Sequence, residues 1–157
     1  MQNRISYFLL FIFFLFAFSA CTKYPEGPLV SLRSKQNRIT GGWQAEYFEV
    51  NGNDSTSALP RDPLNSNMPC YYTFCPCGED AKSKTIMGAC ANGKWDFKNG
   101  SKDILVIDID GTSVYEYPFV QMDITEWSII RLTNKEMWLK TDVSNNEYFV
   151  KYKKIEN

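Results

Sequence analysis

From Trp43 onward, short runs of aromatic and β-branched residues alternate with two-residue turn signals such as Asn51-Gly52, Asn99-Gly100 and Asn145-Asn146. Such pairs supply residues that tolerate a positive φ angle, as tight hairpin turns require. No window of about a dozen residues shows the 3.6-residue period of a helix. The pattern predicts an all-β domain, an antiparallel meander that closes into a barrel or folds as a sandwich. The predicted strands are WQAEYFEV (43–50), CYYTFC (70–75), KTIMGAC (84–90), GKWDFK (93–98), DILVIDI (103–109), SVYEYPFV (113–120), TEWSIIRLT (125–133), EMWLKTDV (136–143) and NEYFVKYKKI, which ends at Ile155.

Alternation within these runs indicates which side chains face the core. One side of 103–109 presents Leu105, Ile107 and Ile109, and one side of 93–98 presents Trp95 and Phe97. Tyr148, Val150 and Tyr152 form the corresponding set in the last strand. Aromatic residues at period two are usually packing residues, so we assign these to the core. Segment 125–133 is apolar on both faces, which predicts a bulge or burial on both sides.

The N-terminus follows the secretory pattern. Arg4 precedes an apolar run over 7–18, and the small residues Ser19 and Ala20 close it just before Cys21. The string FSAC resembles the lipobox of bacterial lipoproteins. The resemblance implies that 1–20 is a signal peptide and that Cys21 receives diacylglycerol, whereas ordinary cleavage would leave a free thiol. A diacylglycerol and an amide-linked acyl chain together supply more than the two membrane-binding groups that stable attachment needs.

Residues 21–40 combine prolines, glycines and scattered charge, which predicts a flexible tether between the lipid and a domain at 41–157. No acidic run of the kind associated with surface export follows Cys21. We therefore expect a protein anchored in the outer membrane and facing the periplasm.

Four further cysteines, Cys70, Cys75, Cys77 and Cys90, are the right number for two disulfides in an oxidising compartment. A Cys75–Cys77 bridge would close a very short ring, so the geometry favours 70–75 with 77–90, or 70–77 with 75–90. Zinc binding is a weaker alternative because the spacing is not that of paired zinc ligands. A redox pair at Cys75 and Cys77 would need an activating group nearby.

Composition excludes several classes of function. The chain has no histidine, which rules out Ser-His-Asp and Cys-His catalysis and histidine-ligated metal. Lys and Arg total 17 against 18 Asp and Glu, without basic runs, so we expect no nucleic-acid partner. We expect no cofactor and no catalytic residues.

Three segments together resemble the lipocalin-like lipoproteins of Bacteroidota, over roughly 41–154. They are GGWQAEYFEVNGND, GKWDFKNGSKDILVIDI and IIRLTNKEMWLKTDVSNNEYFVKYKK. The resemblance implies a small up-and-down β-barrel on a lipid tether, with a cysteine-containing insert at about 51–90. Most members have no assigned function. We expect a non-catalytic binding or interaction module, for a small apolar or glycan-type ligand or for an envelope partner.

The segment ILVIDIDGT (104–112) also resembles the first motif of haloacid-dehalogenase-like phosphohydrolases. In that alternative Asp108 would be the nucleophile, Asp110 the acid–base and Thr112 a positioning group, with magnesium on the carboxylates. That family needs a doubly wound parallel sheet, whereas the residues after Thr112 are predicted strands. We therefore interpret Asp110-Gly111 as a hairpin turn that joins 103–109 to 113–120.

Overall fold

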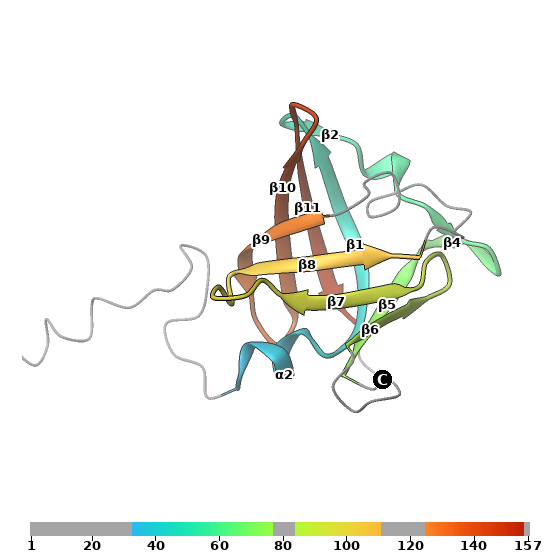
Figure 1. Cartoon of the computed structure of the whole chain (residues 1–157). Helices are drawn as coiled ribbons and strands as arrows, with labels where there is room; N and C mark the ends of the chain where they lie inside the picture. The colour runs from blue at the N-terminus through green and yellow to red at the C-terminus, as the bar shows by residue number, and fades with distance from the viewer. Residues whose placement is uncertain (1–32, 77–83, 111–124, 156–157) are drawn as a thin grey trace, which may run out of the picture.

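Eight antiparallel strands form a closed barrel in the computed structural model, which describes residues 33–76, 84–110 and 125–155. Each strand pairs with the next barrel strand along the chain, and β11 pairs back with β1 (Figure 1). The predicted all-β meander and its closure into a barrel are confirmed. The barrel strands are β1 (Gly41–Val50), β5 (Tyr71–Cys75), β6 (Thr85–Gly88), β7 (Gly93–Phe97), β8 (Ile104–Ile109), β9 (Thr125–Leu132), β10 (Glu136–Val143) and β11 (Asn146–Lys154).

The chain between β1 and β5 adds small elements outside the barrel wall. A tight turn at Asn51 and Gly52, with φ of 51° and 78°, leads into β2 (Asn53–Asp54), which pairs with the end of β1. The 3-10 helix η2 (Thr56–Ala58) and the hairpin of β3 (Arg61–Asp62) and β4 (Asn65–Pro69) follow. These additions occupy 51–70. The second half of the expected insert at 51–90 contains β5 and β6, which are barrel strands.

A short helix, α2 (Lys35–Ile39), closes one end of the barrel, which we call the helix end (Figure 1). Ser34 caps it by accepting a hydrogen bond from the backbone of Asn37, and Ile39 is fully buried. Arg38 donates through Nη1 to the backbone oxygen of Leu132 at 2.7 Å. The folded domain therefore begins near Ser34, and the prediction of a flexible tether as far as residue 40 was wrong. Among the described residues, no helix is long and apolar enough to cross a membrane.

The start of β1 is fixed by contacts between Trp43, α2 and the end of β11. The Trp43 indole donates to the backbone oxygen of Ile39 at 2.6 Å. The Lys154 ammonium lies 4.8 Å from the centroid of the Trp43 ring. It also donates to the backbone oxygens of Arg38 at 2.9 Å and Thr40 at 2.6 Å, which are carbonyls at the C-terminal end of α2. Burial lowers the pKa of Lys154, with a further contribution from Arg33.

This junction requires a glycine at position 41. Gly41 has a φ of +121°, and a Cβ built there would lie 2.8 Å from Cε of Lys154. Because a φ of +121° strains any residue with a Cβ, and because this Cβ would also push the Lys154 side chain from its place over Trp43, we expect Gly41→Ala to lower the free energy of unfolding by about 1–3 kcal/mol in urea titrations. Gly42→Ala is the matched control, since its Cβ would meet Ile155 no closer than 3.4 Å. Equal losses for the two variants would contradict this account of the junction.

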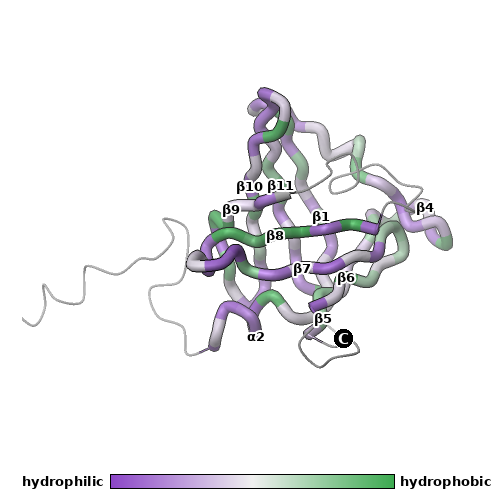
Figure 2. The backbone as a smooth tube through the Cα atoms, in the orientation of Figure 1, coloured by the Kyte–Doolittle hydropathy of each residue, from purple (hydrophilic) through white to green (hydrophobic). Residues whose placement is uncertain are grey.

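Large side chains fill the interior of the barrel. The fully buried set includes Trp43, Trp127, Tyr72, Tyr152, Phe48, Phe74, Ile86, Leu105, Ile107 and Leu132. The alternation predicted for 103–109, 93–98 and the last strand is confirmed. Leu105, Ile107, Trp95, Val150 and Tyr152 are buried, while Ile109, Phe97 and Tyr148 pack partly buried against them. Figure 2 shows the apolar residues of β8 within this arrangement.

Two register shifts decide which side chains face outward. In β9 the pairing with β10 skips Ile130, so Ile129 and Leu132 both point inward. Of the two alternatives predicted for 125–133, a bulge or burial on both faces, the structure has the bulge. In β1 the pairing with β11 shifts between Ala45 and Tyr47. Strict alternation from Trp43 would point Tyr47 into the barrel. The bulge turns Tyr47 outward and Phe48 inward instead.

A disulfide joins Cys70 to Cys90 with a Cα–Cα distance of 5.9 Å. This pairing belongs to neither of the two predicted sets, which were therefore wrong about Cys70 and Cys90. The reason is the antiparallel pairing of β5 with β6, in which Tyr72 lies opposite Gly88. Cys70 lies two residues before Tyr72 and Cys90 two residues after Gly88, so the two cysteines face each other on the same side of the pair. Cys75 is also disulfide-bonded, and Cys77 lies outside the described residues.

Candidate functional site

A row of alternating cations and aromatic rings crosses the outer wall of the barrel over four strands. The register places Arg131 of β9 beside Trp138 of β10, Trp138 beside Lys151 of β11, and Lys151 beside Tyr47 of β1. The Arg131 guanidinium lies 5.0 Å from the Trp138 ring centroid. The Lys151 ammonium lies 4.7 Å from the Trp138 centroid and 5.0 Å from that of Tyr47. These distances are within the range of cation–π attraction.

Phe149, two residues before Lys151 and also on the outer face, completes the group. Its ring lies edge-on to Tyr47 at a centroid distance of 6.3 Å and to Trp138 at 6.2 Å. Lys151 lies 5.6 Å from the Phe149 centroid. We call Tyr47, Trp138, Phe149 and Lys151 the aromatic platform. All four side chains are half-buried, because they pack on one another and not in the core.

Carboxylates lie around the platform. The Tyr47 hydroxyl donates to Glu49 at 2.8 Å, and this hydrogen bond raises the pKa of Tyr47. On the other side of Phe149, Lys140 pairs with Glu147, and the hydrogen bond between them raises the pKa of Lys140. The platform is therefore an apolar surface bordered by groups that can donate and accept hydrogen bonds.

A polar pocket of about 590 Å³ adjoins the platform through Arg131. Arg131 donates through Nε to Glu136 at 2.8 Å, so one guanidinium contacts both the Trp138 ring and the wall of the pocket. The pocket is lined by Glu46, Arg131, Thr133, Asn134, Lys135, Glu136 and Lys153. It therefore offers carboxylate, hydroxyl, amide and ammonium groups beside an aromatic surface.

The interior of the barrel has a different character. The residues described there are packed tryptophan, tyrosine, phenylalanine and aliphatic side chains. Among the pockets that described residues line, one of about 450 Å³ lies on the outer wall, and one of about 590 Å³ lies on the outer wall beside the β9–β10 turn at the helix end. A third, of about 440 Å³, lies between α2 and the β7–β8 connection at the helix end. Among the described residues, no group of three or more histidine, cysteine, aspartate or glutamate side chains could hold a metal ion.

The phosphohydrolase-like segment lies in the antiparallel barrel. Asp108 is exposed on the outer face of β8, and Asp110 follows the strand and is also exposed, whereas Thr112 lies outside the described residues. Residues 105–107 pair with β7 on one side and with β9 on the other. Gly111 and the strand predicted at 113–120, to which the hairpin was expected to lead, lie outside the described residues. The parallel sheet that the phosphohydrolase motif needs does not surround Asp108.

No residue of the platform was predicted from the sequence to be functional. One signal was present in β10, where Trp138 shares a face with Glu136, Lys140 and Asp142 while Met137 and Leu139 occupy the other. A tryptophan on the polar face of an amphipathic strand indicates a role outside the core. Tyr47 gave no such signal, since its orientation depends on the bulge. The predicted lipidation site, Cys21, lies outside the described residues.

No protein-family model matches the chain, and no curated protein matches it. Among solved structures, a lipocalin-like protein from Bacteroides uniformis is similar in fold, with a TM-score of 0.43 and 11% sequence identity. The match covers 75% of this chain and 99% of that chain.

Proposed function

We propose that this chain is a lipid-anchored, non-catalytic envelope protein whose barrel binds a glycan on its outer wall. The observation that supports this proposal is the aromatic platform beside the polar pocket. Sugar rings present flat C–H faces that stack on aromatic side chains, and their hydroxyls need donors and acceptors at the edge of the stack. Trp138 and Tyr47 supply the first kind of contact, and the pocket next to Arg131 supplies the second.

The packing of the barrel favours an external site over an internal one. Fully buried rings such as Trp43, Tyr72 and Trp127 fill the space that a small apolar ligand would need inside a barrel. Aromatic rings on the outer wall, in contrast, remain half-exposed although burying them would stabilise the fold. Exposed aromatic groups of this kind are enriched at recognition sites.

The anchor is the second part of the proposal and rests on the sequence alone. We propose that residues 1–20 are removed and that Cys21 carries the lipid, which would hold the barrel at the periplasmic side of the outer membrane. Intact-mass analysis of protein from the membrane fraction tests it. A mass without an added diacylglycerol, or membrane retention unchanged by Cys21→Ala, would refute the anchor.

Truncation of Trp138 should weaken glycan binding. Removing one stacking ring from a sugar site is expected to lower affinity by about 10- to 100-fold, since aromatic contacts contribute about 1–3 kcal/mol. The measurement is binding of full-length protein and Trp138→Ala to an array of envelope polysaccharide fragments, namely peptidoglycan strands, O-antigen and capsule.

Tyr71→Ala is the matched control, because Tyr71 is an outward-facing aromatic residue on β5 with 39% of its surface exposed. It lies outside the platform, and we expect it to leave glycan affinity unchanged. Binding of the unsubstituted protein to none of the fragments, or equal loss in both variants, would refute the proposed site.

A further inference from the structure

Lysines gather around a second pocket, at the helix end of the barrel. This pocket, of about 440 Å³, is lined by Lys35 of α2, Lys84 before β6, and Lys98 and Lys102 in the β7–β8 connection. Lys35 donates to the backbone oxygen of Lys102 at 2.9 Å and pairs with Asp103. Lys84 pairs with Asp96, and Lys98 pairs with Glu126 at 2.7 Å. The remaining lining residues are Ser34, Gln36, Asp96, Phe97, Asn99, Gly100 and Ser101.

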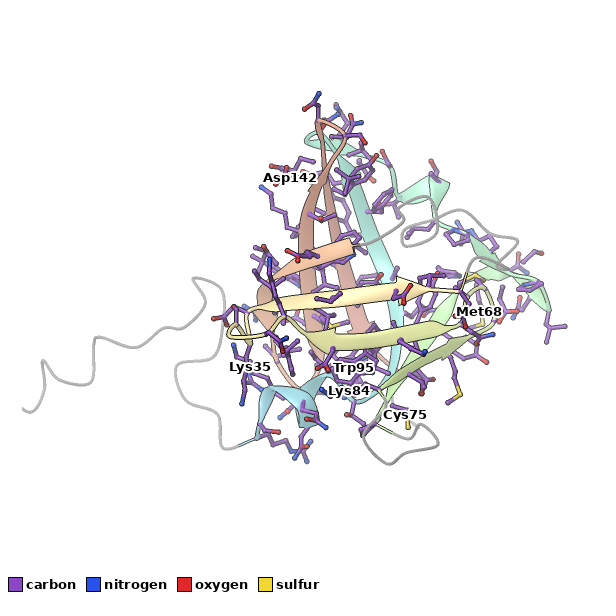
Figure 3. All side chains as sticks on the ribbon, in the orientation of Figure 1. Lys35, Met68, Cys75, Lys84, Trp95 and Asp142 are labelled. Atoms are coloured by element: carbon purple, nitrogen blue, oxygen red, sulfur yellow. A yellow bond between two sulfur atoms is a disulfide. The ribbon has the colours of Figure 1, made fainter. Side chains whose placement is uncertain are left out.

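The charge of the described residues is divided between the two ends of the barrel. At the helix end, basic residues outnumber acidic ones, and Lys98, Lys102, Lys135 and Lys153 among them are exposed. At the opposite end acidic residues predominate. Figure 3 shows Asp142 at that end, away from Lys35 and Lys84. The basic residues of the helix end are Arg33, Lys35, Arg38, Lys84, Lys98, Lys102, Arg131, Lys135, Lys153 and Lys154, and the acidic residues there are Glu46, Asp96, Asp103, Glu126 and Glu136. The opposite end has Glu49, Asp54, Asp108, Asp110, Asp142 and Glu147 with Lys94 and Lys140.

The chain reaches the barrel at this same basic end. Ser34 caps α2 and lines the lysine pocket, and Cys21 precedes it by thirteen residues. A fully extended segment of that length spans at most about 45 Å. An anchor on Cys21 would therefore hold the lysines within reach of lipid headgroups, where each Lys or Arg close to an anionic surface strengthens attachment about fivefold.

We propose that the helix end of the barrel docks on an anionic phospholipid surface, with the lysine pocket against the headgroups. This inference rests on the proposed anchor, which supplies the proximity. Docking in this orientation turns the acidic end away from the membrane. It gives the barrel a fixed orientation that a flexible tether alone would not provide.

Amine acylation of the full-length, lipid-bearing protein on vesicles tests the orientation. One vesicle set contains phosphatidylcholine alone, and the other contains phosphatidylcholine mixed with phosphatidylglycerol. On the mixed vesicles we expect acylation of Lys98 and Lys102, measured by mass spectrometry, to slow at least severalfold relative to Lys94 at the opposite end. High salt should remove the difference because it screens exposed charges. Equal rates for the three lysines on both vesicle sets would overturn the proposal.

Two variants with the same change in net charge provide the control. In each variant the protection of Lys98 is measured as its acylation rate on phosphatidylcholine vesicles divided by its rate on mixed vesicles. Lys102→Glu should abolish most of this protection, and Lys94→Glu should preserve it. Protection lost equally in both variants would overturn docking at the helix end. Release of the docked barrel by inorganic phosphate, beyond the release by sodium chloride of equal ionic strength, would also overturn it, because a free anion would then be the ligand. Flotation with phosphatidylcholine vesicles in high salt reports the anchor alone, so failure of the anchor is distinguished from failure of docking.

Discussion

Replacing Trp43 with alanine should destabilise the protein more than any substitution on the outer wall. Trp43 is fully buried, donates to Ile39 and lies under Lys154, so it connects the barrel interior, α2 and the end of β11. Truncation of a buried tryptophan costs about 3–5 kcal/mol. That is a large part of the roughly 5–15 kcal/mol that stabilises a typical domain. We expect urea unfolding to show a loss in this range, or a protein that is already largely unfolded.

Trp138→Ala is the control for this experiment, because Trp138 is half-buried on the outer wall. Its truncation removes cation–π and edge contacts but creates no interior cavity. We expect a loss of about 1 kcal/mol. Comparable losses for Trp43→Ala and Trp138→Ala would contradict the assignment of one ring to the core and the other to the surface.

A second large effect is expected in alkaline solution. Burial raises the pKa of Tyr152 well above its ordinary value of 10.0 and also raises that of Tyr72, whose ring packs edge-on against Tyr152 at 6.5 Å. In the unfolded chain both phenols ionise near pH 10. Between the unfolded and folded pKa values the folded protein therefore binds more protons. Its stability is fully present below pH 10 and falls as the pH rises further, by about 1.4 kcal/mol per pH unit for each tyrosine.

Urea unfolding between pH 9 and pH 11 measures this dependence. The double variant Tyr72→Phe/Tyr152→Phe should lose most of the decline, because it has no buried phenol to retain a proton. Tyr71→Phe should keep it, since Tyr71 is exposed on the outer face of β5. An alkaline decline of the same slope in the double variant would show that other groups cause it.

The barrel could be predicted from the sequence because the patterns that indicate it lie within single strands and turns. Alternation in 103–109 and in the last strand defines inward and outward faces, and residues that tolerate positive φ mark the turns. Even there the turn between β10 and β11 lies at Ser144 and Asn145, one residue before the predicted pair. The helix α2 could not be predicted, because five residues are too few to show a helical period even though Lys35, Arg38 and Ile39 share its buried face.

The disulfide and the aromatic platform could not be predicted because both depend on how neighbouring strands are aligned. Cys70 meets Cys90 because β5 and β6 pair with Tyr72 opposite Gly88, and cysteine spacing alone does not reveal that alignment. The aromatic platform depends on the bulge between Ala45 and Tyr47, which moves Tyr47 beside Lys151 on the outer wall. Neither the bulge nor the pairing of β1 with β11 can be read from either strand by itself.

Side chains fill the described part of the barrel interior, and we propose that the ligand binds on the outer wall. The four tryptophans report on it directly, since Trp43, Trp95 and Trp127 are buried in the core and Trp138 lies on the platform. The measurement is an NMR titration of the four indole N–H resonances with the fragment that binds most tightly on the polysaccharide array. We predict that the Trp138 resonance shifts progressively while the three core resonances stay in place. Shifts of Trp43, Trp95 or Trp127 with Trp138 unchanged would place the ligand inside the barrel and contradict the account.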